Sequence, residues 1–137
     1  MASFAATVGQ WAEKVEGALE AVFKEAAQEL VSQLNQLAPV DTGFLRSSLM
    51  ASTTAMPALT RANPGMSVPA DLGDILLVIN SADLGDTIYL GYTANYAAFV
   101  HFGAQGRAPR PWVTMVAQRW EMIVAEKAVE VRRRLGL

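Results

Sequence analysis

The chain has no cysteine and a single histidine among its 137 residues. The lack of cysteine excludes a disulfide framework, a thiolate metal site and a cysteine nucleophile. One histidine without cysteine also argues against a zinc site. A Ser-His-Asp triad would have to use His101, and no Gly-x-Ser-x-Gly elbow presents a serine to it. We therefore expect neither enzyme activity nor a cofactor, and we interpret His101 as a packing and hydrogen-bonding residue before a glycine turn.

Long apolar runs and a large net charge are missing as well. No window reaches the roughly 18 consecutive apolar residues of a membrane span, and the N-terminus lacks the basic and apolar blocks of a secretory signal. The net charge of −2 argues against a general nucleic-acid binder. Hydrophobic residues make up 52% of the chain. One domain of this length can therefore form its own core and still offer apolar surface to partners.

The charges that are present are unevenly spread. Residues 1–40 sum to −3, from two lysines and five glutamates, and residues 41–99 sum to −3, from two arginines and five aspartates. Residues 100–137 sum to +4, from six arginines and one lysine against three glutamates. An acidic front and a basic back can complement each other between copies of one chain.

Residues 4–37 predict one long helix, because their apolar side chains recur at spacings of three or four. Pro39 ends the helix, since it biases Ala38 away from helical angles. Such a helix is ~50 Å long at ~1.5 Å per residue, whereas a domain of this size has a radius of gyration of only ~14 Å. The helix should therefore overhang its own domain and expose part of its apolar stripe. The candidate interface residues on it are Trp11, Glu13, Glu16 and Glu20.

The middle of the chain predicts a small antiparallel sheet. A short helical turn around Leu45 precedes a strand over roughly residues 48–56, and residues 57–73 form a long loop with three prolines. We expect this loop to be mobile in the free protein and to become ordered, if at all, against a neighbour. The β-branched apolar run at 75–79 predicts a buried strand over 74–81, paired in a hairpin with a strand over 87–92.

The last third predicts a short helix over 95–102, a Gly/Pro loop over 103–111, and one final helix from Pro111 to about residue 135. The fold class is α+β: a long N-terminal helix and a C-terminal helix packed on a small antiparallel β-sheet with a long inserted loop. We interpret the chain as a single domain, with 1–38 as the long helix, 39–111 as the sheet and loop, and 112–137 as the C-terminal helix.

Two sets of charged residues leave alternatives open. Four aspartates flank glycines around residues 71–86, where aspartate is an ordinary turn residue. The rival interpretation is a hydrolase or nuclease that uses Asp71, Asp74 and His101. Such an enzyme would show metal-dependent turnover. Arg107 and Arg110 lie in the Gly/Pro loop. They are either solvated loop charges or contacts to a partner's acidic surface or to phosphates. A DNA-binding module using them and Arg132–Arg134 is the other rival, with steep salt dependence as its mark.

Two segments in register resemble one family. The first is Pro39-Val40-Asp41-Thr42-Gly43-Phe44-Leu45-Arg46-Ser47-Ser48-Leu49, and the second is Tyr96-Ala97-Ala98-Phe99-Val100-His101-Phe102-Gly103, followed by Ala108-Pro109-Arg110-Pro111-Trp112. The order and spacing are similar to those of the small neck or tail-completion proteins of long-tailed bacteriophages. The departures are modest, with His101 where an acidic residue is common and Trp112 where phenylalanine is common. The motif residues are Pro39, Asp41, Thr42, Gly43, Leu45, Arg46, Tyr96, His101, Gly103, Pro109 and Pro111.

The resemblance implies a structural virion protein of the head–tail junction. It implies a homo-oligomeric ring, with a hexamer favoured by analogy with sixfold tails, between head-completion or connector proteins and the tail tube or tail terminator. A tail-terminator role is the alternative. The ring would be located in the virion, and in the host cytoplasm during assembly. Non-specific contact with duplex DNA in the lumen would be compatible with the basic loop, whereas no membrane contact is implied. Within the first motif, we expect Asp41 to cap the following turn and Gly43 to adopt a backbone conformation that is costly for other residues.

Overall fold

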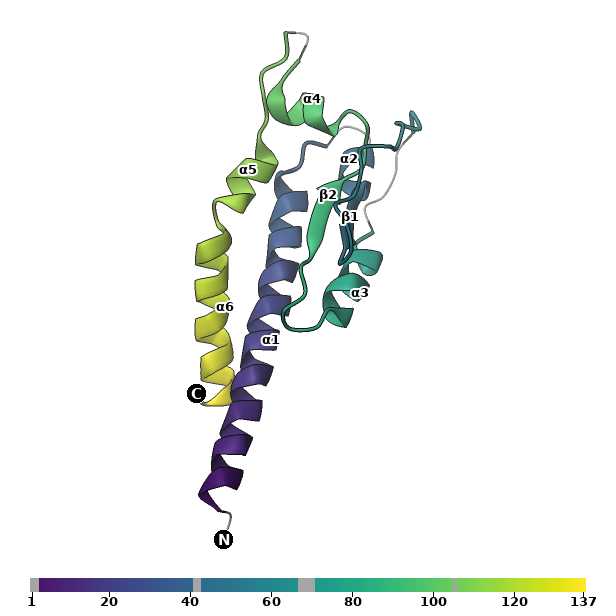
Figure 1. Cartoon of the computed structure of the whole chain (residues 1–137). Coiled ribbons are helices and arrows are strands. Elements are labelled where there is room, and N and C mark those ends of the chain that lie inside the picture. The colour runs from purple at the N-terminus through teal and green to yellow at the C-terminus, as the bar shows by residue number, and fades with distance from the viewer. Residues whose placement is uncertain (1–2, 41–42, 67–70, 105) are drawn as a thin grey trace.

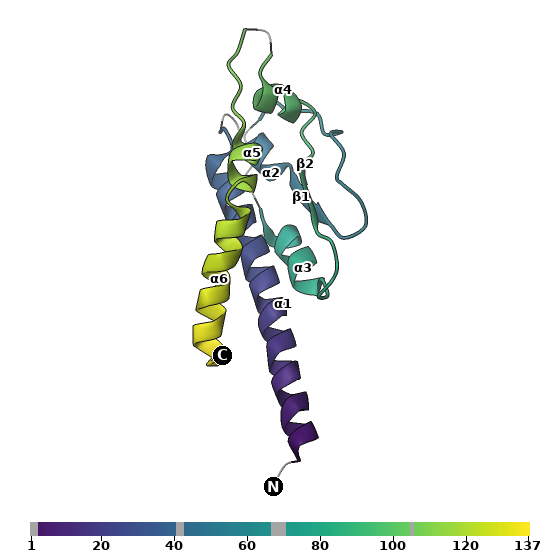
Figure 2. The ribbon, with the colours of Figure 1, turned by 60° about the vertical axis from the view of Figure 1, so that its left-hand side comes forward.

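The structure is a computed structural model that describes residues 3–40, 43–66, 71–104 and 106–137. A central helix, α1 (Phe4–Leu37), has the bounds that the sequence predicts. The Ser3 side chain caps it by accepting a hydrogen bond from the Ala6 N–H at 3.2 Å. Two layers flank α1 (Figures 1 and 2): helices α5 (Trp112–Ala117) and α6 (Trp120–Leu135) on one side, and helix α3 (Gly73–Ser81) with the sheet on the other.

The sheet contains two antiparallel strands in the described residues, β1 (Leu49–Ser52) and β2 (Tyr89–Tyr92). Their register pairs Leu49 with Tyr92 and Ser52 with Tyr89. A single turn of helix, α2 (Phe44–Ser47), leads into β1. The α+β class is confirmed, and the first strand is shorter than the sequence predicted.

The strand predicted over 74–81 is wrong, because this segment is helix α3. Ile75 and Ile79 are buried at a spacing of four, whereas Leu77 between them is 66% exposed. That one-sided burial follows a helical period and not the alternation of a strand. The predicted hairpin between 74–81 and 87–92 is consequently wrong too, and β2 pairs with β1 instead.

The prediction of a single C-terminal helix is also wrong, because the helix is interrupted between α5 and α6. Gln118 and Arg119 are not part of either helix, and the Arg119 N–H donates to the Val116 carbonyl three residues back. The break lets α5 bury Trp112 and Val116 in the core while α6 follows α1. Pro111 precedes α5 with ψ of 58°, so it stands before the helix and is not its first residue. The predicted short helix is α4 (Ala97–Phe102).

A buried polar chain ties the sheet to α1. The Tyr92 hydroxyl donates to Asn35 Oδ1 at 2.8 Å, and Asn35 Nδ2 donates to the Arg46 carbonyl at 3.2 Å. Burial raises the pKa of Tyr92 to about 12, although the nearby Trp112 indole opposes that rise. The phenol therefore remains a neutral hydrogen-bond donor over the whole physiological range, and it fixes β2 against the end of α1.

Candidate interface site

The free end of α1 (residues 4–17) contains no buried residue. The first buried side chain along the helix is Ala18, and the exposed fractions are 85% for Phe4, 45% for Val8 and 61% for Trp11. Figures 1 and 2 show this end of α1 extending beyond the C-terminal end of α6. The overhang expected from the sequence is thus present, and its apolar stripe has no partner in the described part of the chain.

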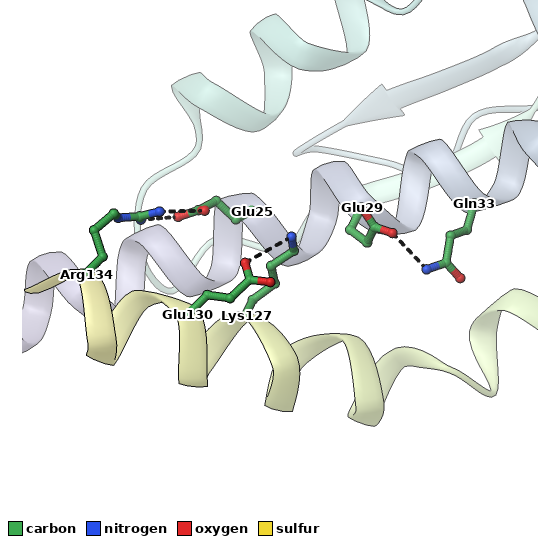
Figure 3. Close-up of polar contacts among 6 residues, drawn as sticks. All are labelled: Glu25, Glu29, Gln33, Lys127, Glu130 and Arg134. Carbon is green, nitrogen blue, oxygen red and sulfur yellow. Dashed lines mark hydrogen bonds and ion pairs between the residues drawn. The ribbon is translucent and has the colours of Figure 1, made fainter.

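Most carboxylates farther along α1 have partners within the chain. The Glu25 carboxylate accepts two hydrogen bonds from Arg134 of α6, at 2.6 and 3.2 Å (Figure 3). Glu29 accepts a hydrogen bond from Gln33 at 3.0 Å, and Glu20 pairs with Lys24 at 2.8 Å. Among the described residues, Glu13 and Glu16 make no ion pair. Of the predicted glutamates, these two are therefore free to contact another chain.

The Glu25–Arg134 pair predicts a specific pH dependence. Hydrogen bonding from Arg134 is the largest influence and lowers the pKa of Glu25 below its ordinary 4.5. Burial opposes this shift, and the charges of Arg134 and then Lys127 lower the pKa further. Because the folded pKa is the lower one, this pair stabilises the fold above the unfolded pKa and loses its contribution as pH falls through the folded pKa. NMR titration should place the Glu25 carboxyl below 4.5, and Arg134→Ala should move it upward. Arg133→Ala, next in sequence and also exposed, is the matched control; an equal shift in both variants would contradict the assignment.

The loop between α4 and α5 projects from the opposite end of the molecule (Figure 1). Backbone hydrogen bonds hold it at two places: the Arg107 N–H donates to the Ala104 carbonyl, and the Arg110 N–H donates to the Val100 carbonyl, both at 3.0 Å. The side chains of Arg107 and Arg110 are exposed. Within the described residues they form no ion pair, which leaves both cations available to a partner.

Both arginines line a groove of about 490 Å³, which we call the tip groove. Its apolar wall is formed by Leu45, Tyr96 and Val100, with the exposed side chains of Val40 and Phe99 at its rim. Tyr96, Phe99 and Val100 thus line the same groove, and Phe99 is 64% exposed. A concave apolar surface with two cations is suited to a ligand that carries both an apolar group and a negative charge.

Gly103 fixes the geometry of the loop between α4 and α5, which we call the tip loop. Its φ of 83° and ψ of 149° belong to a region that is essentially restricted to glycine. A Cβ at this position would lie 2.9 Å from the Arg107 carbonyl oxygen and 3.0 Å from the Pro109 nitrogen. The loop that carries the arginines therefore requires glycine here.

Substituting Gly103 by alanine should lower the free energy of unfolding by about 2–3 kcal/mol, since strain and a backbone clash act together. The matched control is Gly106→Ala, at φ of 79° but with open space around the added Cβ. It should cost only about 1–2 kcal/mol. Urea denaturation of the two variants measures the difference. Equal losses would show that the close approach to Arg107 does not matter.

His101 has the packing and hydrogen-bonding role that the sequence predicts. Its Nε2 lies 3.1 Å from the Thr114 hydroxyl and 3.4 Å from the Thr114 N–H, in the first turn of α5. The ring also contacts Trp112, with centroids 5.6 Å apart. His101 thereby holds the start of α5 against α4.

The first motif shapes the junction between α1 and α2. Leu45 is buried, and Arg46 donates to the Ala38 and Gln36 carbonyls at 3.2 Å. These contacts satisfy carbonyls at the C-terminal end of α1, where a cation is also favoured by the helix dipole. Gly43 has φ of 84°, which confirms the expected conformation costly to other residues. The expected cap by Asp41 lies outside the described residues, as does Thr42.

The aspartates take part in local turns. Asp71 Oδ1 accepts from the Gly73 N–H at 2.9 Å, and Asp86 Oδ2 accepts from the Asp83 N–H at 2.8 Å. Across the described ranges, no group of three or more His, Cys, Asp or Glu residues could hold a metal ion. The long loop is anchored at Arg61, whose N–H and carbonyl bond to Thr93 and Asn95 at 2.8 Å. Its mobility and its ordering by a neighbour stay predictions.

A comparison with models of protein families identifies the family to which the chain belongs. The HK97-gp10-like family model, described as "Bacteriophage HK97-gp10, putative tail-component", matches residues 2–103. The chain belongs to this family. Membership in this family makes the chain a structural component of phage tails, and so of the virion. It confirms the phage neck or tail-completion family that the two motifs suggested.

Two further comparisons found no relative of this chain. Neither the search of curated proteins nor the search of solved structures found a match. The family match covers α1 to α4 and both motifs up to Gly103, whereas the arginines of the tip loop follow it. No helix in the described residues is long and apolar enough to cross a membrane.

Proposed function

We propose that this chain is a structural, non-enzymatic protein of the phage head–tail junction that forms a ring between the connector and the tail tube. The free end of α1 is the observation that carries the proposal. Phe4, Val8 and Trp11 form an exposed stripe on a helix that extends past its own domain. Isolated exposed apolar residues are normal, but a continuous stripe of large side chains is typical of an interaction surface.

The positions of the two candidate surfaces on the molecule support the proposal of a ring. The free end of α1 and the tip loop lie at opposite ends of the molecule (Figure 1). A contact between unlike surfaces of identical copies is heterologous, and such contacts close into rings when the rotation between copies closes. Six copies are expected, by analogy with the sixfold symmetry of long tails. Head-completion or connector proteins and the tail tube are the expected neighbours.

Mass measurement tests this role. The purified protein, alone and mixed with its tail tube, should yield a ring of several copies, either by itself or once the tube is present. A single copy bound per tube would contradict ring formation. Binding to the tube end in place of the connector would favour the tail-terminator alternative. Metal-dependent hydrolysis by the pure protein would overturn the structural role itself.

A further inference from the structure

We infer that the tip groove of one copy receives the free end of α1 from a second copy, an inference that rests on the ring-forming role proposed above. The groove combines an apolar wall with Arg107 and Arg110 along its lining. The free end of α1 combines an apolar stripe with glutamates. An amphipathic helix laid in a hydrophobic groove is a recurring mode of recognition.

The helix presents its anchors at suitable spacings. On a helix that turns about 100° per residue, the side chains of Phe4, Val8, Trp11 and Val15 lie within roughly 60° of one another. Trp11 is the largest of them and is 61% exposed. Tryptophan and arginine are the residue types most often found at the energetic centre of interfaces. Trp11 is therefore the expected anchor in the groove.

The position of each glutamate around the helix indicates which one can pair with the arginines of the groove. Glu16 lies roughly 110° from the middle of the stripe, whereas Glu13 lies roughly 170° from it and faces away. Of these two glutamates, only Glu16 stands at the flank of the stripe, where it can meet arginines at the edge of the groove while the stripe is buried. Lys14 lies on the opposite flank, roughly 90° from the middle of the stripe. Glu16 has no ion-pair partner among the described residues, so the contact displaces no existing pair.

A second cavity fits this helix less well. It measures about 360 Å³ and is lined almost entirely by apolar side chains, among them Met56, Leu59, Phe102 and Val113. Its lining contains His101 but no arginine or lysine to pair with Glu16. Since α4 carries Phe99 toward the tip groove and Phe102 toward the other cavity, these two exposed phenylalanines provide a matched pair for a test.

Disulfide trapping tests the contact directly, because the chain contains no cysteine. The variant combines Ala12→Cys, beside the stripe, with Ala108→Cys, in the lining of the tip groove; both positions are exposed. One chain cannot bridge its own pair, since the two sites lie on segments at opposite ends (Figure 1) and a disulfide requires Cα atoms within about 7 Å. The matched control combines Ala12→Cys with Leu59→Cys, an exposed position in the other cavity.

Oxidation of assembled tailed particles should convert the first variant into a ladder of covalent multimers, with at least tenfold more cross-linked chain than in the control. Phe99→Ser added to the first variant should reduce the ladder at least tenfold, whereas Phe102→Ser should leave it unchanged. Equal cross-linking of the two pairs, or none in particles that contain the ring, would overturn the groove assignment and leave the ring intact. A ladder ending at the dimer would support the groove contact but contradict the ring.

Discussion

Replacing Phe4, Val8 and Trp11 together by serine is expected to leave a folded monomer that no longer enters tailed particles. The three side chains are 85%, 45% and 61% exposed in the chain, so the free energy of unfolding should change by less than about 0.5 kcal/mol for each. Burying each side chain against a neighbour is worth about 1.5–3 kcal/mol. Even half of that total exceeds 1.4 kcal/mol, which corresponds to about tenfold in affinity. Incorporation, measured by mass spectrometry of purified particles, should therefore fall at least about tenfold.

The matched control replaces three residues on the other faces of the same free end: Ala6, Gln10 and Glu13, again by serine. All three are exposed, and none belongs to the apolar stripe. This variant should enter particles at the parental level. If both triple variants are incorporated normally, the overhang is only a solvated helix end, and the ring must be held by other surfaces.

The second large effect is expected from reversing the charge of the tip groove. The double variant Arg107→Glu with Arg110→Glu should keep its fold, because both side chains are exposed and form no ion pair in the described residues. It should nevertheless be excluded from particles, since two carboxylates would then face Glu16 of the adjacent copy. The yield of infectious, tailed particles should fall at least about tenfold; a normal yield would show that the tip loop is only solvated surface.

Restoring the charge pattern identifies the partner of these arginines. Adding Glu16→Arg to the double variant should recover at least part of the yield, because the ion pairs form again with exchanged signs. Glu13→Arg, on the side of the helix that faces away, should not restore it. If the arginines instead contact DNA phosphates in the lumen, neither change should rescue, and binding of duplex DNA should weaken steeply with salt.

The long helix could be predicted from the sequence with its bounds. Its apolar residues keep spacings of three or four over about nine turns, and Pro39 follows its C-terminal end. The overhang also followed from the sequence, because a helix of this length cannot fit within a domain of this size. Local periodicity and the length of the helix were sufficient for both conclusions.

Helix α3 could not be assigned correctly in the same way. Its apolar run of five residues is too short to distinguish a buried strand from a helix by period. The burial of Ile75 and Ile79 depends on packing against β1 and α1, which are distant in sequence. Asp74 in the first turn was a local signal for a helix start. No proline or glycine marks the interruption at Gln118 and Arg119, so the sequence contains no local signal for it.

The candidate site was predictable in part. The sequence identified Trp11, because it lies in the apolar stripe of a helix too long for its domain, and the two arginines, because they lie in a Gly/Pro loop. It did not identify the tip groove, since this is assembled from the end of α1, α2, α4 and the tip loop. The 64% exposure of Phe99 in this groove became evident only in the three-dimensional arrangement. Nor could the sequence show that Glu20, Glu25 and Glu29 have partners within the chain.

A map of the neck of the assembled tailed particle, obtained by electron cryo-microscopy, tests the central claim most directly. The account predicts a closed ring of this chain between connector and tail tube, with the free end of α1 of each copy seated against the tip of the next. A neck that lacks the chain, or that holds it as isolated copies with exposed α1 ends, would contradict the account.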